Sequence, residues 1–275
     1  MLGGWASRGG RGRGRLALAA VLWLAGPARA SEAELRLCMA ESSQLPLTLW
    51  RAAELAEQLP TQLDVFTAAL LGREARLRVQ AQVLPWRRCL LEVQMGRLDA
   101  VLGLSYTPER AQWAVFPLRA GAPDESLRLR HDAYHWYVST RTKLRWDGEA
   151  LRGLPAPRLG SVAGYSVVER LQAQGYVVDT QTASVAASLR MLALGRIDAA
   201  ALLQGEVEPW LAREPGLAQG LRRLDPPLLR RSYFLAFSQA YAQQDAQRLQ
   251  RIWAALALVR ESDLQRRAEQ AAAGG

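Results

Sequence analysis

This sequence has few of the residues that usually mark metal centres, membrane spans or nucleic-acid contacts. It contains two histidines, two cysteines and four phenylalanines, and Lys143 is the one lysine among 35 basic residues. No run reaches about 18 consecutive apolar residues, so no transmembrane helix is predicted. The basic residues are spread out and form no cluster, which argues against a nucleic-acid-binding protein. Because 49% of the 275 residues are hydrophobic, the chain can bury a large core.

The first 30 residues have the features of a secretory signal peptide. Four arginines between residues 8 and 15 precede an apolar run over residues 16–26, and Ala28-Arg29-Ala30 matches an A-x-A cleavage site. We expect cleavage near Ala30, which would release a periplasmic protein that begins at Ser31. Removal of the five leader arginines leaves 30 basic and 26 acidic residues, a net charge of +4.

One stretch of the sequence occurs twice. Residues 95–104 read MGRLDAVLGL, and residues 194–203 read LGRIDAAALL. Before each copy, apolar residues recur at helical spacing; each copy then supplies a helix-ending glycine and an apolar run typical of a buried strand. We expect the aspartates, Asp99 and Asp198, to be structural. The copies lie 99 residues apart, too far for a solenoid, and indicate two similar α/β lobes with ligands beyond the strand ends.

Two cysteines in an exported protein favour a disulfide. Cys38 ends the predicted first strand, over residues 35–40, and Cys89 lies in the first turn of the helix before the first repeat. The two could therefore meet in one lobe. The alternative is a pair of buried free thiols that act as small hydrophobic residues.

Periodicity predicts the other elements of the chain. We expect further strands over residues 76–83, 135–140, 158–162, 176–179 and 233–238, and helices over 48–58, 63–71, 167–174, 206–212 and 249–259. Residues 119–132 are polar with Gly and Pro and are predicted to be a loop or linker. The last residues, 265–275, are expected to be frayed.

These pieces, in this order, resemble extracytoplasmic solute-binding proteins of family 3, the polar-amino-acid receptors of ABC transporters. The resemblance rests on Trp86 with the GRLDA block, Ser105 with Thr107-Pro108-Glu109-Arg110, Phe116-Pro117, Gly164-Tyr165-Ser166, the GRIDAA block, Pro226-Pro227-Leu228, Tyr233–Ser238 and Trp253. It implies an α/β, two-lobed periplasmic-binding-protein fold of type II, with a ligand cleft that closes by a hinge. The implied boundaries are 31–134 for the first part of lobe 1, 135–230 for lobe 2 and 231–275 for the return to lobe 1.

The resemblance also implies a ligand site. Arg110 matches the arginine that binds the ligand's α-carboxylate, a role suited to its planar guanidinium. Ser105, with Gly103 in the same strand, matches a strand-end ligand contact. Gly164-Tyr165-Ser166 matches a turn at a helix start, where backbone amides bind anions. The alternatives are a solvated Arg110 and a serine that only caps its helix.

Two departures from the family pattern concern the ligand's amine and side chain. Where the family usually has an aspartate that holds the ammonium group, this chain has Leu203 and Gln204. Glu41 or Glu206 could substitute. The first loop, over residues 42–46, lacks the aromatic residue that often covers the ligand. We therefore expect Gln204 and Glu41 near the ligand, and a preference for a small anionic ligand over a simple α-amino acid.

The sequence predicts a periplasmic binding protein without catalysis, cofactor or bound metal. Its expected partners are a small anionic or amino-acid-like solute and an ABC-transporter permease, with no nucleic acid, and the chain is expected to be monomeric. One alternative is a sensor or partner-binding protein of the same fold, favoured by the missing aspartate. Another is a cyclohexadienyl-dehydratase-like enzyme, which needs a carboxyl such as Glu206 in the cleft. His131 and His135 flank a predicted strand and lack a third metal ligand.

Overall fold

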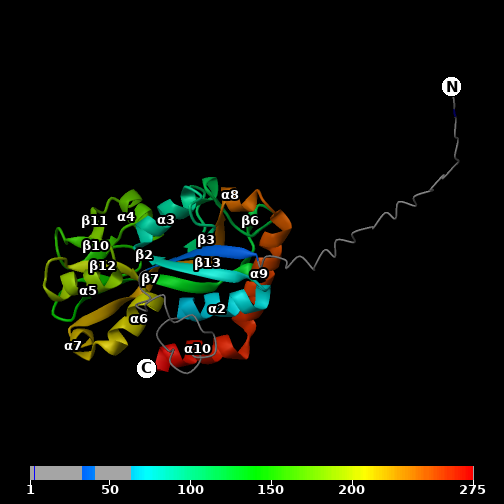
Figure 1. Ribbon diagram of the computed structural model, residues 1–275. Helices are drawn as coiled ribbons and strands as arrows, with labels where there is room; N and C mark the ends of the chain where they lie inside the picture. Colours follow the sequence, from blue (N-terminus) through cyan, green and yellow to red (C-terminus); the bar gives the residue numbers. More distant parts are fainter. Residues whose placement is uncertain (1–2, 4–32, 41–62, 275) are drawn as a thin grey trace. The chain divides into compact units, whose positions relative to one another are not determined.

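The computed structural model describes residues 3, 33–40 and 63–274, and Figure 1 traces their path. The predicted leader and its cleavage site, Glu41, the loop over residues 42–46 and the helix over 48–58 lie outside the described residues. Within the described ranges, no helix is both long enough and apolar enough to cross a membrane. The elements form a mixed α/β fold.

One mixed sheet continues through the whole fold, in the strand order β11-β10-β12-β7-β13-β3-β1-β2. We call the half with β1, β2 and β3 lobe 1, where β1 pairs in parallel with both neighbours. In the other half, lobe 2, β10 pairs in parallel with β11 and β12. The bounds are β1 (Glu34–Ala40), β2 (Arg78–Leu84), β3 (Ala100–Ser105), β7 (Arg130–Ser139), β10 (Leu159–Val162), β11 (Val178–Thr182), β12 (Ala199–Leu203) and β13 (Leu221–Ser238).

The two long strands β7 and β13 join the lobes. They pair antiparallel with each other, and the ladder is interrupted between Leu224 and Leu229, at a cis Asp225–Pro226 bond. The sequence analysis predicts only the last third of β13, residues 233–238. The unpredicted part contains two prolines, at 226–227, which have no N–H group to donate in a strand ladder. In the structure those prolines lie inside the interruption, so the rest of the strand keeps its pairing. The lobe boundaries expected at 134/135 and 230/231 fall inside these strands and stay a prediction.

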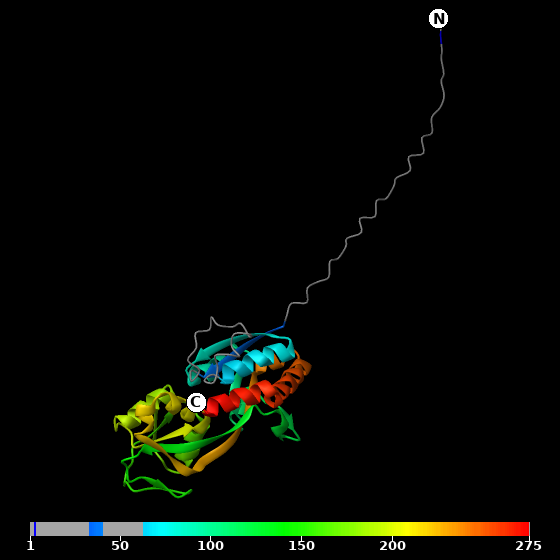
Figure 2. The same ribbon diagram turned by 90° about the horizontal axis from the view of Figure 1, so that it is seen from below.

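Helices cover the sheet in both lobes. Their bounds are α2 (Leu63–Ala75), α3 (Trp86–Gln94), α4 (Ser166–Ala173), α5 (Val185–Ala193), α6 (Gln204–Arg213), α7 (Pro215–Ala218), α8 (Gln239–Ala242), α9 (Ala246–Glu261) and α10 (Asp263–Gly274). Figure 2 shows α2, α9 and α10 side by side, so residues 265–274, which were expected to fray, belong to a helix that packs on α2 and α9 of lobe 1. Trp253 of α9 is 2% exposed, and its Nε1 donates to the carbonyl of Leu235 at 2.7 Å.

The two repeats build the same local structure in both lobes. Each helix ends at a glycine with positive φ. The aspartate three residues later accepts hydrogen bonds from both the backbone N–H and the guanidinium of one arginine. Asp99 accepts from the backbone N–H of Arg36 at 2.7 Å and from its guanidinium at 2.6 Å. Asp198 does the same with Arg158, at 2.8 and 2.9 Å. Each aspartate therefore fixes the register of two neighbouring strands, which is a structural role.

The predicted disulfide is present. Cys38 of β1 and Cys89 of α3 are joined, with their Cα atoms 5.7 Å apart, and both side chains are fully buried. The bridge ties the first strand of lobe 1 to the helix that precedes the first repeat. That helix also carries Trp86, which reaches lobe 2, so the bridge supports one wall of the interlobe contact.

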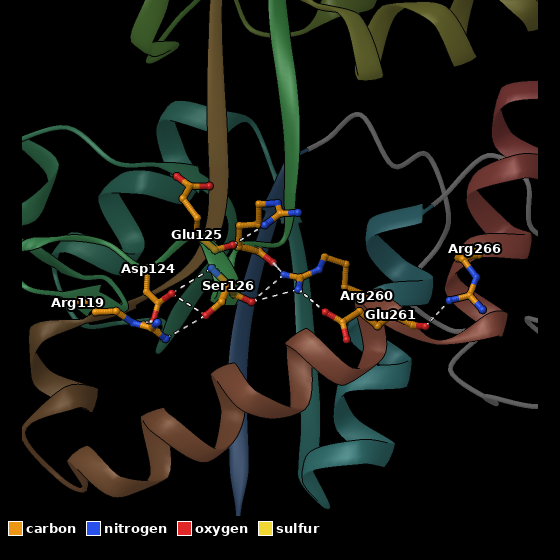
Figure 3. Close-up of polar contacts among 8 residues, drawn as sticks. Arg119, Asp124, Glu125, Ser126, Arg260, Glu261 and Arg266 are labelled. Atoms are coloured by element: carbon orange, nitrogen blue, oxygen red, sulfur yellow. Dashed lines mark hydrogen bonds and ion pairs between the residues drawn. The ribbon is translucent and has the colours of Figure 1, made fainter.

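Residues 119–132, predicted to be a loop, are more ordered than expected. They contain the end of the hairpin β5 (Leu118–Arg119) and β6 (Ala122–Pro123), the short helix η2 (Glu125–Leu127) and the start of β7. Figure 3 shows the cause: Arg260 of α9 donates to the carbonyls of Ser126 and Arg128, and Asp124 accepts from the backbone N–H of Ser126 at 3.0 Å. A charged side chain from a distant helix satisfies these carbonyls, a contact that local sequence does not reveal.

Candidate functional site

Arg110 lies at the start of the short helix η1 (Arg110–Gln112), just after β3, and is 6% exposed. Its backbone N–H donates to Thr107 Oγ1 at 3.1 Å, which fixes the turn. Its Nη1 donates to the carbonyl and to the Oγ of Ser105, at 2.9 and 2.6 Å. Its Nη2 crosses to lobe 2 and donates to the carbonyl of Gly164 at 2.9 Å. The guanidinium therefore bridges the two lobes.

Two more hydrogen bonds cross between the lobes beside Arg110. The indole Nε1 of Trp86 donates to the same Gly164 carbonyl at 3.1 Å, and Ser105 Oγ donates to Ser166 Oγ at 3.1 Å. Ser166 is the first residue of α4, and Gly164 has φ of +84° in the turn before it. The structure thus brings together four of the residues that the family resemblance places at the ligand.

Tyr165 fills the space next to this contact. It is 5% exposed, its ring packs edge-on against Tyr134 at 5.6 Å, and its hydroxyl donates to a carboxylate oxygen of Glu206. The cavity that remains between the lobes has a volume of about 20 Å³, room for roughly one water molecule. Among the described residues, the two lobes therefore meet closely and leave little free space between them.

The charges around this cavity differ in how they are neutralised. Arg130 of β7 forms an ion pair with Asp64 of α2, but Arg110 forms no ion pair with any described residue. Burial lowers the pKa of Arg110. Burial also raises the pKa of Glu206 to about 7, against the opposing effect of the hydrogen bond from Tyr165. The cleft thus holds one buried cation that makes no close ion pair with a described residue, and one carboxyl whose burial favours its protonated form.

The other predicted site residues fall at different distances from the cavity. Gly103 of β3 lines it, with φ of +86°. Gln204 begins α6 and is not among the described residues that line the cavity, whereas Leu203 and Glu206 are. Glu41 lies outside the described residues. The sequence analysis did not place Asp64, Arg130 or Tyr134 at the site, and no motif marks their positions in the sequence. Tyr233 also lines the cavity; it begins the Tyr233–Ser238 motif, but no ligand contact was predicted for it.

Neither histidine belongs to this site. Nδ1 of His131 lies 3.0 Å from Ser232 Oγ, and Nδ1 of His135 lies 3.1 Å from the carbonyl of Leu224. In the described part of the chain, no three His, Cys, Asp or Glu side chains come together in a way that could hold a metal ion.

Alanine at Gly164 is expected to open the lobes. A Cβ there would lie 3.2 Å from Trp86 Cδ1 and 3.3 Å from Leu90 Cδ1, in a residue whose positive φ already costs about 1–2 kcal/mol for an L side chain. Gly175→Ala is the matched control, because its φ is +86° but nothing lies within 4 Å of a Cβ. Both variants should lose similar backbone stability, and only Gly164→Ala should show a larger radius of gyration by small-angle X-ray scattering. Equal radii would contradict the closed arrangement.

Comparisons with known proteins agree on the fold. No family model matches the sequence, and no curated protein matches it. Among solved structures, the chain is similar to a histidine kinase sensor domain with similarity to periplasmic binding proteins, at 17% identity over 87% of this chain and 95% of that one, with a TM-score of 0.66. It is similar to the arginine-, lysine-, histidine-binding protein ArtJ from Geobacillus stearothermophilus, at 14% identity over 88% and 96%, with a TM-score of 0.67.

A third similar structure is the GluR0 ligand-binding core from Nostoc punctiforme in complex with L-glutamate, at 13% identity over 85% of this chain and 96% of that one, with a TM-score of 0.63. Identities this low show the fold alone. The two lobes, the continuous sheet and these likenesses together show that the chain has the two-lobed α/β fold of periplasmic binding proteins, the fold that its resemblance to solute-binding proteins of family 3 predicts.

Proposed function

We propose that this chain is a periplasmic solute-binding protein that captures a small carboxylate-bearing solute between its lobes and delivers it to an ABC-transporter permease. The proposal is supported by one observation above all: the guanidinium of Arg110 is buried and makes no close ion pair with a described residue, and Glu169 attracts it only at longer range. A buried charge is costly without a partner of opposite sign. A ligand carboxylate would supply that partner.

Arg110 retains the donors that a carboxylate needs. A guanidinium has five N–H groups, and three side-chain hydrogen bonds are made to protein oxygens. One of them, to the Gly164 carbonyl, exists only while the lobes are closed on each other. When the lobes separate, Nη2 is released, and a planar carboxylate can accept from the guanidinium in its place.

The amine side of an amino acid finds a poorer partner in this cleft. Leu203 lines the cavity where the family usually has an aspartate, and Glu206 lies two residues into α6. With a pKa of about 7 and a hydrogen bond from Tyr165, Glu206 is only partly charged at neutral pH. An organic acid, or an amino acid whose amine is masked, avoids the burial of an ammonium group beside a neutral carboxyl.

The test is calorimetry with an amino acid and its deaminated analogue. After a thermal-shift screen of such pairs, glutarate is expected to bind tighter than L-glutamate at pH 6, because Glu206 is mostly protonated there. At pH 8 the carboxylate of Glu206 can hold the ammonium group, so the difference in affinity between glutarate and L-glutamate should become smaller. Glu206→Gln should make this difference independent of pH. Tighter binding of the amino acid at pH 6 would mean that another acid holds the ammonium group.

Two other functions have one supporting observation each. The likeness to a histidine kinase sensor domain, together with the closed cleft, favours a sensor role, in which a partner protein recognises the closed lobes. A carboxyl with a pKa of about 7 in the cleft favours an enzyme, since a general acid works best near its own pKa. Turnover of prephenate-like acids would identify the enzyme, and adjacent kinase or permease genes would separate sensing from transport.

A further inference from the structure

A second cavity lies outside the cleft, on lobe 2. It has a volume of about 550 Å³, in the size range of small-molecule sites, and shares no lining residue with the interlobe cavity. Its walls come from the hairpin of β8 (Arg145–Trp146) and β9 (Leu151–Arg152), with the residues just before it, and from the start of β13. Figure 2 shows this green hairpin beside the first part of β13. We call it the basic groove, after Lys143, Arg145, Arg222 and Arg223 in its lining.

Most of the positive charge in the basic groove is not neutralised. Lys143 and Arg145 are exposed and form no ion pair with any described residue. Arg222 is half-buried, and its Nη2 donates to the carbonyl of Leu144, a neutral acceptor, at 3.0 Å. Only Arg223 is paired, with Glu208 and with Asp225. Three of the four cationic side chains that line the groove therefore make no ion pair with a described residue, and the one carboxylate in the lining, Asp225, pairs with Arg223.

The hairpin itself brings like charges together. In the register of β8 and β9, Arg145 lies directly opposite Arg152, an arrangement that is unfavourable between two strands. Asp147 pairs with Arg152 at 2.7 Å and leaves Arg145 without compensation. An anion in the basic groove would offset this repulsion.

The floor of the basic groove is fixed in place. The indole of Trp146 is 8% exposed, and its buried Nε1 has no acceptor among the described residues, although buried indole N–H groups usually find one. The Arg222–Leu144 hydrogen bond ties the two walls together. This wall needs no rearrangement to take a ligand, whereas a ligand would order the exposed side chains of Lys143 and Arg145.

From these contacts we propose that the basic groove binds a phosphate-bearing anion with two or more negative charges. A single carboxylate would neutralise only one of the three cations, whereas a phosphate group accepts several hydrogen bonds and matches the arginine fork. The phosphate can belong to a free small molecule or to a lipid headgroup, because both present the same oxygens. The site is separate from the proposed cleft and does not depend on what the cleft binds.

Inorganic pyrophosphate and lipid vesicles test the proposal. We expect the chain to bind pyrophosphate in calorimetry, more weakly as salt is raised, or to sediment with phosphatidylglycerol vesicles and not with phosphatidylcholine vesicles. The variant Lys143→Ala/Arg145→Ala should weaken this binding about tenfold or more, which corresponds to about 1.4 kcal/mol. Both residues are exposed and make no ion pair, so the fold should be kept.

The matched control is Arg196→Ala/Arg267→Ala, which removes two exposed, unpaired arginines elsewhere on the chain. It should bind as the unchanged protein does. If pyrophosphate binds and vesicles do not, the ligand is a free anion. If vesicles bind and pyrophosphate does not, the ligand is a lipid headgroup. The proposal is overturned if neither probe binds, or if the control loses as much affinity as the groove variant, because the attraction would then be a property of the net charge.

Discussion

Arg110→Ala is expected to abolish solute binding in the cleft. The guanidinium is buried and makes no close ion pair with a described residue, so a bound carboxylate would rely on it for its charged partner. Truncation of one member of a buried charge pair costs about 2–5 kcal/mol, so affinity should fall by roughly a hundredfold or more. Calorimetry with the tightest ligand from the thermal-shift screen gives this number directly.

Three controls separate binding from folding in this experiment. Arg110→Lys keeps the charge but loses the planar fork, so it should bind with intermediate affinity. Arg87→Ala removes an exposed, unpaired arginine from α3 and should change nothing. Thermal unfolding should show that each variant is folded. If Arg110→Ala binds as well as the unchanged protein, the carboxylate must be held elsewhere, and Arg130 in the same cavity is the next residue to replace.

Reduction of the Cys38–Cys89 bridge is expected to cost the fold roughly 4 kcal/mol. The bridge joins residues 51 apart, and the loop-closure entropy that it removes from the unfolded chain gives about this value. Urea unfolding with and without a reductant should show a lower midpoint for the reduced protein. Because lobe 1 contains both sulfur atoms, we expect its unfolding to respond most.

The double variant Cys38→Ala/Cys89→Ala checks that the effect belongs to the bridge. Its stability should lie near that of the reduced protein and should not respond to the reductant. Both side chains are fully buried, so the alanines add a small packing loss of their own. The prediction would be contradicted if the reductant did not change the urea midpoint of the unchanged protein.

Much of the fold follows from local patterns in the sequence. The repeated helix–glycine–aspartate–strand unit predicts matching parts of both lobes, and the structure shows why: Asp99 and Asp198 each fix a neighbouring strand through an arginine. Residues 221–232 of β13 were not predicted to be a strand, and Pro226 and Pro227 interrupt the pattern there. Its pairing with β7 survives on both sides of the interruption, a long-range effect that overrides local propensity.

Those residues of the candidate site that belong to one short sequence motif could be predicted. Ser105 and Arg110 stand five residues apart, and the turn at Gly164 was visible as a helix start, so their meeting follows from the resemblance. Asp64 and Arg130 were not predictable, because an ion pair between residues 66 apart depends on tertiary structure that local sequence does not encode. The sequence analysis also did not predict that the side chain of Tyr165 would occupy the space between the lobes. The identity of a residue does not reveal where its side chain lies in the folded protein.

Because β13 lies next to β3 in the sheet, its position near the end of the chain determines which lobe can be completed first during synthesis. Lobe 2 takes β7, β10, β11 and β12 from residues 130–203, and these strands can pair with one another before any later residue emerges. The apolar, fully buried strand β3 has to wait for residues 233–237 to cover its open edge, and for α9 to cover its face. The lobe that begins first is therefore finished last. A chain that stops before residue 233 presents an unpaired apolar strand edge, the kind of edge through which proteins aggregate.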